Sequence, residues 1–205
     1  MKTVLINGRS VSRRHAAGFG LIELLVVLCV QGILMAALVM SFTSQLRSHR
    51  QQERMSEMQQ IARAAMALIT REARMAGYDP TGIPFSGTTY DPDALHILAD
   101  LNGDGDVADA NENVVYAYDA ATQRLTRNTG GGRQSVAEQV EAFAFEYRDA
   151  NGLPTQVEQQ IRQLRVTITV RTAQPDPRYE QNGGYRTYTL ESLITPPNLG
   201  LSISG

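Results

Sequence analysis

The sequence predicts an α+β fold, in which one long amino-terminal helix is followed by an antiparallel β-sheet domain. Three patterns support this class: an apolar run from Leu24 to Phe42, apolar residues at spacings of three and four as far as Ala73, and short alternating runs beyond Tyr78. Spacings of three and four are typical of a helix with one buried face, and alternation is typical of a half-buried strand. A helix that precedes all the strands favours α+β over a parallel α/β sheet.

The apolar run is long enough to cross a membrane. Its only polar residues are Gln31 and Ser41, and about 20 such residues span the hydrocarbon core as a helix. Basic residues lie upstream, and no acidic residue occurs between Met1 and Ala17. This charge pattern predicts a single pass through the cytoplasmic membrane, with the amino terminus in the cytoplasm and the rest of the chain outside.

Glu23 is an unusual residue at the start of this run. A carboxylate at the centre of a bilayer costs about 2.5–3.5 kcal/mol, so an acid inside an apolar segment usually has a partner. The alternative is that Glu23 lies among the lipid headgroups and is hydrated. A secretory signal peptide has small residues after its apolar core, whereas here Ala16, Ala17 and Gly18 come before it.

The run Gly18–Leu24, with the sequence GFGLIEL, resembles the cleavage and methylation motif of type IV pilins and type II secretion pseudopilins. The resemblance implies that a prepilin peptidase cuts after Gly18 and that Phe19 becomes the N-methylated first residue. It also implies that Glu23 meets the amino terminus of a neighbouring subunit, so that other pilin subunits and the membrane are partners of the helix. Gly20 departs from the motif, where Thr or Ser is commoner.

Four segments follow from these patterns. Residues 1–18 are the predicted leader, 19–42 the transmembrane and assembly half of the helix, 43–77 its amphipathic half, and 78–205 a globular β-rich domain. Gly77 followed by Pro80 predicts the end of the helix.

Alternation predicts strands in the globular domain. The clearest has Leu164, Val166, Ile168 and Val170 on one face. Ser135–Glu138 matches a capping box on a short helical turn, and Asn182–Gly183 matches a tight hairpin turn. The tail from Pro196 is expected to be a loose end or an edge segment. Further strands are expected around Leu95–Ala99, Val114–Tyr118, Arg124–Thr126, Phe143–Tyr147 and Tyr185–Ile194.

A second resemblance concerns the helix end. The block Arg71–Tyr78, the strand Glu141–Tyr147 and the segment Leu193–Leu199 are similar to PilW-like minor pilins. The chain also has no Pro in the membrane half of the helix, and its single Cys29 cannot form an intrachain disulfide. Both features favour a minor subunit over the major component of a filament.

The segment Asp100–Asp106, with the sequence DLNGDGD, matches the first half of an EF-hand-type calcium loop. Oxygen side chains at alternate positions and a Gly at the sixth suit a calcium ion, which takes six to eight oxygen ligands. Asn111 stands at the twelfth position, where a bidentate acid is expected, and Glu112 follows it. The alternative is a solvated acidic turn. The predicted ligands are Asp100, Asn102, Asp104, Asp106 through its backbone carbonyl, Asp109 and Glu112.

Composition narrows the classes of function. Without the leader the chain has 15 basic and 21 acidic side chains, a balance that argues against nucleic acid as the main partner. The sequence shows no nucleophile elbow, phosphate loop or clustered histidines, so we do not expect an enzyme. The leading prediction is a minor type IV pilin that primes or caps the pilus. The alternatives are a type II secretion minor pseudopilin resembling GspJ, or a membrane-anchored calcium-dependent module for adhesion or DNA uptake.

Overall fold

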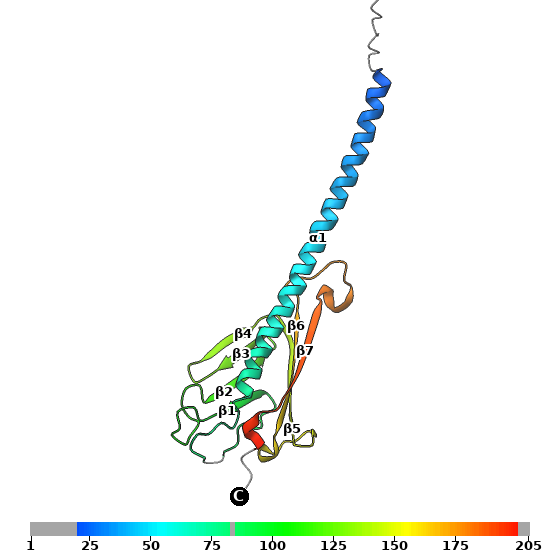
Figure 1. Cartoon of the computed structure of the whole chain (residues 1–205). Helices are drawn as coiled ribbons and strands as arrows, with labels where there is room; N and C mark the ends of the chain where they lie inside the picture. The colour runs from blue at the N-terminus through cyan, green and yellow to red at the C-terminus, as the bar shows by residue number, and fades with distance from the viewer. Residues whose placement is uncertain (1–19, 83–84, 201–205) are drawn as a thin grey trace, which may run out of the picture. The chain divides into compact units, whose positions relative to one another are not determined.

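The computed structural model describes residues 20–82 and 85–200 (Figure 1). The chain divides into two compact units, Met1–His49 and Arg50–Gly205. The long helix α1, Leu21–Ala73, contributes residues to both. The predicted processing positions Gly18 and Phe19 lie outside the described residues.

The described part of the first unit consists of Gly20 and the helical residues that follow it. The carbonyl oxygen of Gly20 accepts hydrogen bonds from the backbone N–H groups of Glu23 (3.0 Å) and Leu24 (3.2 Å), which close the first turn. Every side chain from Leu21 to His49 is exposed, including those of the apolar run. By length and composition, α1 is the one helix among the described residues that could cross a membrane.

The second unit contains two antiparallel sheets. The first has the order β1-β2-β3-β4 and the second the order β5-β6-β7. The α+β class is therefore confirmed, with two sheets where the sequence indicated only an antiparallel arrangement. The strands are β1 (Ala94–Leu98), β2 (Asn113–Asp119), β3 (Arg124–Asn128), β4 (Arg133–Ala137), β5 (Val140–Arg148), β6 (Gln163–Arg171) and β7 (Thr187–Ile194), and the 3-10 helices are η1 (Glu158–Gln160), η2 (Gln181–Gly184) and η3 (Pro197–Gly200).

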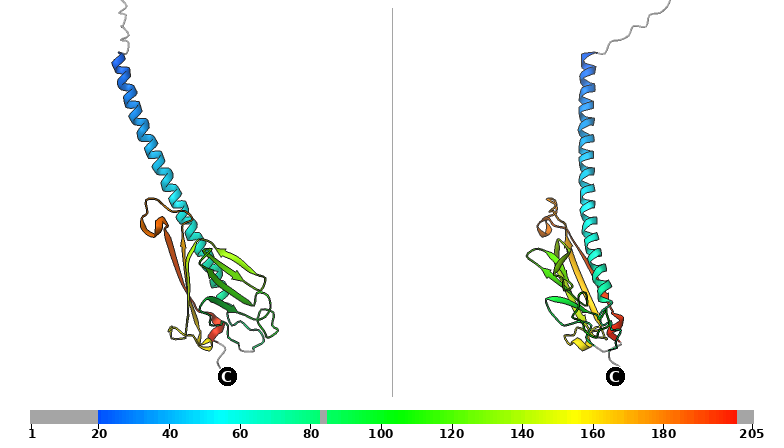
Figure 2. Two further views of the ribbon diagram at one scale, coloured as in Figure 1. Left: turned by 180° about the vertical axis from the view of Figure 1, so that it is seen from behind. Right: turned by 90° about the vertical axis from the view of Figure 1, so that its left-hand side faces the viewer.

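The second half of α1 forms a core with both sheets (Figures 1 and 2). Its buried stripe begins at Met58, whereas Met55, which has the same spacing in the sequence, is 36% exposed. Small side chains allow the helix to approach the strands closely, as dense interior packing requires. The stripe consists of Met58, Ala62, Ala65, Met66, Ile69 and Ala73, and Ala76 in the turn after the helix is buried as well.

Strand β6 is the middle strand of the second sheet and shows the predicted alternation. Its residues Leu164, Val166, Ile168 and Val170 are fully buried, and the residues between them are partly exposed. The two sheets are joined at the hydroxyl of Tyr118 on β2. This group donates to the backbone oxygens of Val140 (3.0 Å) and Glu141 (2.9 Å) on β5.

Two local predictions are wrong and one is only half right. Ser135 lies in β4 and pairs with Thr126 of β3, so Ser135–Glu138 caps no helix. Leu199 is 4% exposed and belongs to the core, so the described part of the tail, residues 196–200, is not a loose end. Asn182 and Gly183 have positive φ (48° and 61°) as predicted, but they lie in η2 within a longer connection between β6 and β7.

The end of the helix is tied to β1. Gly77 adopts a φ of +74°, which favours glycine, and its N–H donates to the carbonyl oxygen of Leu98 (2.9 Å). The backbone of Gly87 passes so close that a Cβ on it would lie 2.2 Å from the Gly77 nitrogen. Gly87 is thus required by the close approach of two backbone segments.

We expect Gly87→Ala to destabilise the second unit, because the added methyl group would overlap backbone atoms that cannot rotate away. Overpacking of this kind costs about 1–3 kcal/mol, which should appear as a lower midpoint in urea unfolding. Gly131→Ala is the matched control, since a Cβ there meets nothing within 4 Å. Equal midpoints for the two variants would contradict the close approach.

Candidate functional site

Glu23 lies in the first turn of α1. Negative charge is favourable there because the helix dipole places partial positive charge at this end. Among the described residues, Glu23 takes part in no ion pair, and the helix around it presents exposed apolar side chains. Its carboxylate is therefore available to a positive group from outside the described part of the chain.

The acidic loop predicted from the sequence connects β1 to β2. These strands pair with Leu98 opposite Asn113, and the pairing continues where the Ala99 N–H donates to the Glu112 carbonyl oxygen (2.9 Å). The two ends of the loop, Asp100 and Glu112, are therefore held side by side. Both are buried, at 1% and 2% exposure, although both are acids.

Asp100 and Asn102 shape the loop through hydrogen bonds to its backbone. The Asp100 carboxylate accepts from the N–H groups of Gly103 (2.6 Å) and Gly105 (3.0 Å). Gly105 has a φ of +90°, and this turn is the reason for a glycine at the sixth position. The Asn102 side-chain oxygen accepts from the Asp104 N–H (2.8 Å), and its amide donates to Asp104 (3.0 Å) and Asp109 (2.7 Å).

Three of the six predicted ligands come together around one point. One carboxylate oxygen from each of Asp104, Asp106 and Glu112 lies within 4.8 Å of the other two. Asp106 contributes its side chain to this group, whereas the sequence pattern assigned it a backbone carbonyl. Asp100, Asn102 and Asp109 are not members of the group.

The backbone conformation at Asn111, the twelfth residue of the calcium-loop pattern, determines which side chain at this end of the loop points into it. Asn111 has a φ of +74° and is exposed, and its N–H donates to the carbonyl oxygen of Thr129 (3.0 Å). This conformation leaves the next residue, Glu112, to face the loop. The Glu112 Oε1 accepts from the N–H groups of Leu101 (2.9 Å) and Asn102 (3.1 Å).

The charges in the loop repel one another. The negative charge of Asp104, and next that of Glu112, raises the pKa of Asp109 above its ordinary value. Hydrogen bonds, first from the Asp106 N–H and then from Asn102, lower the pKa of Asp104. The loop therefore stabilises the ionised form of Asp104 at the expense of that of Asp109.

The sequence analysis missed a charged cluster beneath α1. Glu72 belongs to the predicted amphipathic half of the helix, and its side chain is only 12% exposed. The Arg127 guanidinium binds both of its oxygens, at 2.7 Å and 3.0 Å, and the hydroxyl of fully buried Tyr116 donates to it as well. Strand pairing places Tyr116 opposite Arg127. The available signal was spacing, since Glu72 follows buried Ile69 by three residues and precedes buried Ala76 by four.

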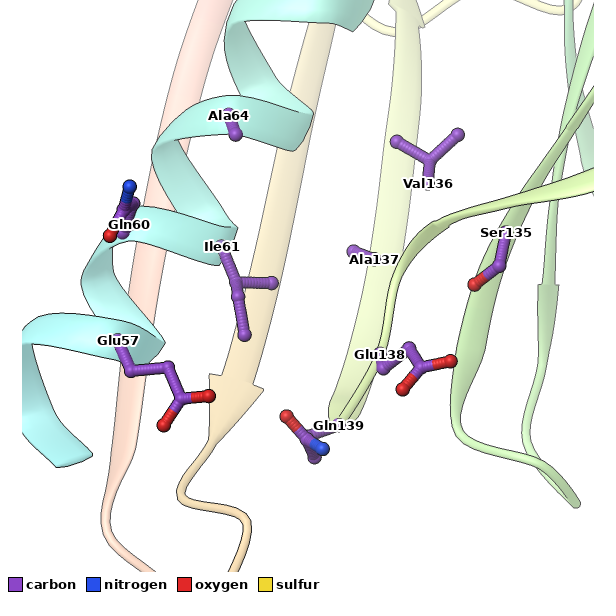
Figure 3. A pocket seen from close by; sticks show the side chains of 9 residues that line it. All are labelled: Glu57, Gln60, Ile61, Ala64, Ser135, Val136, Ala137, Glu138 and Gln139. Carbon is purple, nitrogen blue, oxygen red and sulfur yellow. The ribbon is translucent and has the colours of Figure 1, made fainter.

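An open groove separates α1 from β4 (Figure 3). The helix provides one wall with Glu57, Gln60, Ile61 and Ala64, and the other is provided by residues 135–139. Glu138 in this wall forms an ion pair with Arg124 (3.0 Å). The lining contains no histidine, cysteine or tyrosine, and we assign it no chemistry. The prediction that the chain is not an enzyme stays a prediction.

No protein-family model matches the chain, and no curated protein matches it in sequence. Among solved structures, it is similar to a type IV-like pilin from Thermus thermophilus. The TM-score is 0.43 and the sequence identity 13%, over 73% of this chain and 98% of that chain. A similarity at this level assigns no function to the chain.

Two buried tyrosines should make the second unit sensitive to alkaline pH. Burial, and next the hydrogen bond to Glu72, raise the pKa of Tyr116, and burial raises the pKa of Tyr147 to about 12. In the unfolded chain a tyrosine ionises near pH 10. Between about pH 10 and 12 the folded state therefore holds more protons than the unfolded state. Stability should fall as the pH rises, by up to about 1.4 kcal/mol per pH unit for each tyrosine.

Urea unfolding between pH 8 and 11.5 measures this slope, and Tyr147→Phe should reduce it. The readout is the dependence on pH, so a uniform loss of stability in the variant does not affect it. An identical slope in wild type and variant would show that Tyr147 ionises equally in both states.

Proposed function

We propose that this chain is a minor type IV pilin, which is cut after Gly18 and enters the pilus through α1. The observation that carries the proposal is the position of Glu23, five residues beyond Gly18 and in the first turn of an exposed apolar helix. A folded α+β unit follows the helix, which suits a subunit that presents a globular part on a filament. Priming or capping of the filament is the role we assign to it.

The exposed apolar face of α1 supports burial in lipid or among other helices. Apolar side chains from Leu21 to Phe42 are 47–85% exposed. A continuous apolar surface of this size is not stable in water and marks a membrane or protein interface. A membrane protein with one such helix can leave the bilayer only if similar helices replace the lipid around it.

The carboxylate of Glu23 gives this assembly its register. Cleavage after Gly18 would create an α-amine on Phe19, which is positively charged at neutral pH. A carboxylate and an amine buried together cost far less than either buried alone. A subunit would therefore be held where its Glu23 reaches the amine of a neighbour, which fixes the axial offset between adjacent helices.

Processing is tested by mass spectrometry of the protein recovered from its native host. We expect a chain that begins at Phe19 and carries one methyl group on its amine. Gly18→Glu should block cleavage, because a large charged side chain replaces the smallest one at the cut. Gly20→Ser is the matched control and should leave cleavage unchanged, since a Cβ at Gly20 meets nothing within 4 Å. A wild-type chain that retains residues 1–18 would refute the proposal.

Assembly is tested by Glu23→Gln, which keeps the shape of the side chain and removes its charge. We expect about tenfold less protein in filaments sheared from the cell surface, with an unchanged amount in the membrane. Tenfold corresponds to about 1.4 kcal/mol, well within the value of a charge pair at low dielectric. Gln31→Leu, also on the exposed part of α1, is the control.

Equal incorporation of wild type and Glu23→Gln would contradict the charge pairing. Absence of the wild-type protein from surface filaments, together with cleavage after Gly18, would favour the secretion pseudopilin over the pilus subunit.

A further inference from the structure

The β1–β2 loop carries negative charge that its own segment does not neutralise. Between Tyr78 and Gln123 the sequence contains nine Asp and Glu residues and no Lys or Arg. Five of the nine lie in the loop itself, from Asp100 to Glu112. The rise in the pKa of Asp109, caused first by Asp104, agrees with a cluster in which acids face acids.

The burial of Glu112 is not explained by the hydrogen bonds of the loop alone. Its side chain is buried, and Oε1 is satisfied by two backbone N–H groups. The second oxygen, Oε2, is also buried and has no hydrogen-bond partner in the described structure. A buried charged oxygen without a partner is costly, so a cation beside it would be strongly favoured.

We propose that the β1–β2 loop binds a calcium ion through the carboxylates of Asp104, Asp106 and Glu112. Oxygens that share one calcium ion at about 2.4 Å are at most about 4.8 Å apart, and the three carboxylates satisfy this limit. All three donors are oxygens, which suits a hard cation and not zinc. Asp104 and Asp106 are exposed, so water can complete the shell of six to eight ligands.

Two other residues of the loop, Asp100 and Asn102, have positioning roles. Asp100 holds the backbone at Gly103 and Gly105, and Asn102 orients Asp104 through two hydrogen bonds. The hairpin pairing beside Ala99 fixes Glu112 on the opposite side. Only Asp104 and Asp106 then need to move when the ion arrives. The proposal does not depend on assembly into a filament.

The test uses the full chain in detergent, stripped of metal with a chelator and then titrated with CaCl₂ by calorimetry. We expect one site with a dissociation constant of about 0.1–1 mM, as in other weak extracellular sites. At a calcium concentration tenfold above that constant, the Tm of the second unit should rise by about 3–5 °C. Asp106→Asn should weaken binding at least about tenfold without affecting the fold, since this side chain is exposed.

Glu112→Gln separates metal binding from a purely structural role. In chelator the variant should unfold at the same temperature as wild type or above it, because a neutral amide relieves the repulsion among the acids. Added calcium should then raise its Tm much less than that of wild type. Asp149→Asn is the matched control: this Asp also accepts backbone N–H groups in a turn, but lies between β5 and β6, and its loss should leave the calcium response intact.

Three results would overturn the proposal. The first is a wild-type chain whose Tm and heat of titration do not respond to calcium. The second is an equal response to MgCl₂, which would identify general screening of charge. The third is wild-type calcium affinity in both Asp106→Asn and Glu112→Gln.

Discussion

Burial of one stripe of α1 against two sheets is the constraint on which the second unit depends. A sheet of three or four strands has one apolar face, and without a cover that face would be in water. The helix packs against both sheets through a stripe in which three small alanines are combined with the larger side chains of Met58, Met66 and Ile69. Each fully buried large side chain contributes about 1.5–3 kcal/mol, so the stripe supplies much of the stability of the unit.

The packing of α1 against the two sheets also positions the acidic loop between β1 and β2. At the helix end Gly77 donates to Leu98, the last residue of β1, and the N–H of Asp100 donates to the carbonyl oxygen of Tyr78. The base of the loop is therefore bonded both to β2 and to the turn that ends α1. Beneath the helix, Glu72 joins α1 to β2 and β3 through Tyr116 and Arg127. The two acids therefore differ: Glu72 is paired with Arg127, whereas Glu112 has no positively charged partner among the described residues.

Local patterns predicted the elements but not how they meet. The alternation in β6 and the separate strands β1 and β2 follow from residue spacing alone, and the structure has all of them. The stop signal at Gly77 is also present, at the end of a turn that follows the last helical residue, Ala73. Ser135–Glu138 was misassigned because pairing with β3 outweighs a weak capping motif. The burial of Glu72 could not be predicted because a charge in a helical pattern is usually solvated, and its partners Tyr116 and Arg127 come from strands far away in the sequence. The loop residues were predicted, but the choice of Glu112 over Asn111 depends on one positive φ.

Glu23 and Glu112 both require a positive charge from outside the described residues. Each is an acid whose negative charge finds no cation among the described residues, in a setting where solvation by water is reduced or would be lost. For Glu112 the neighbours are the carboxylate oxygens of Asp104 and Asp106, an arrangement that fits a small ion. For Glu23 the surroundings are a long apolar helix surface, which no small ion could accompany into lipid at low cost. The counter-charge that we propose for it is therefore attached to an equally apolar partner, the amine end of another such helix.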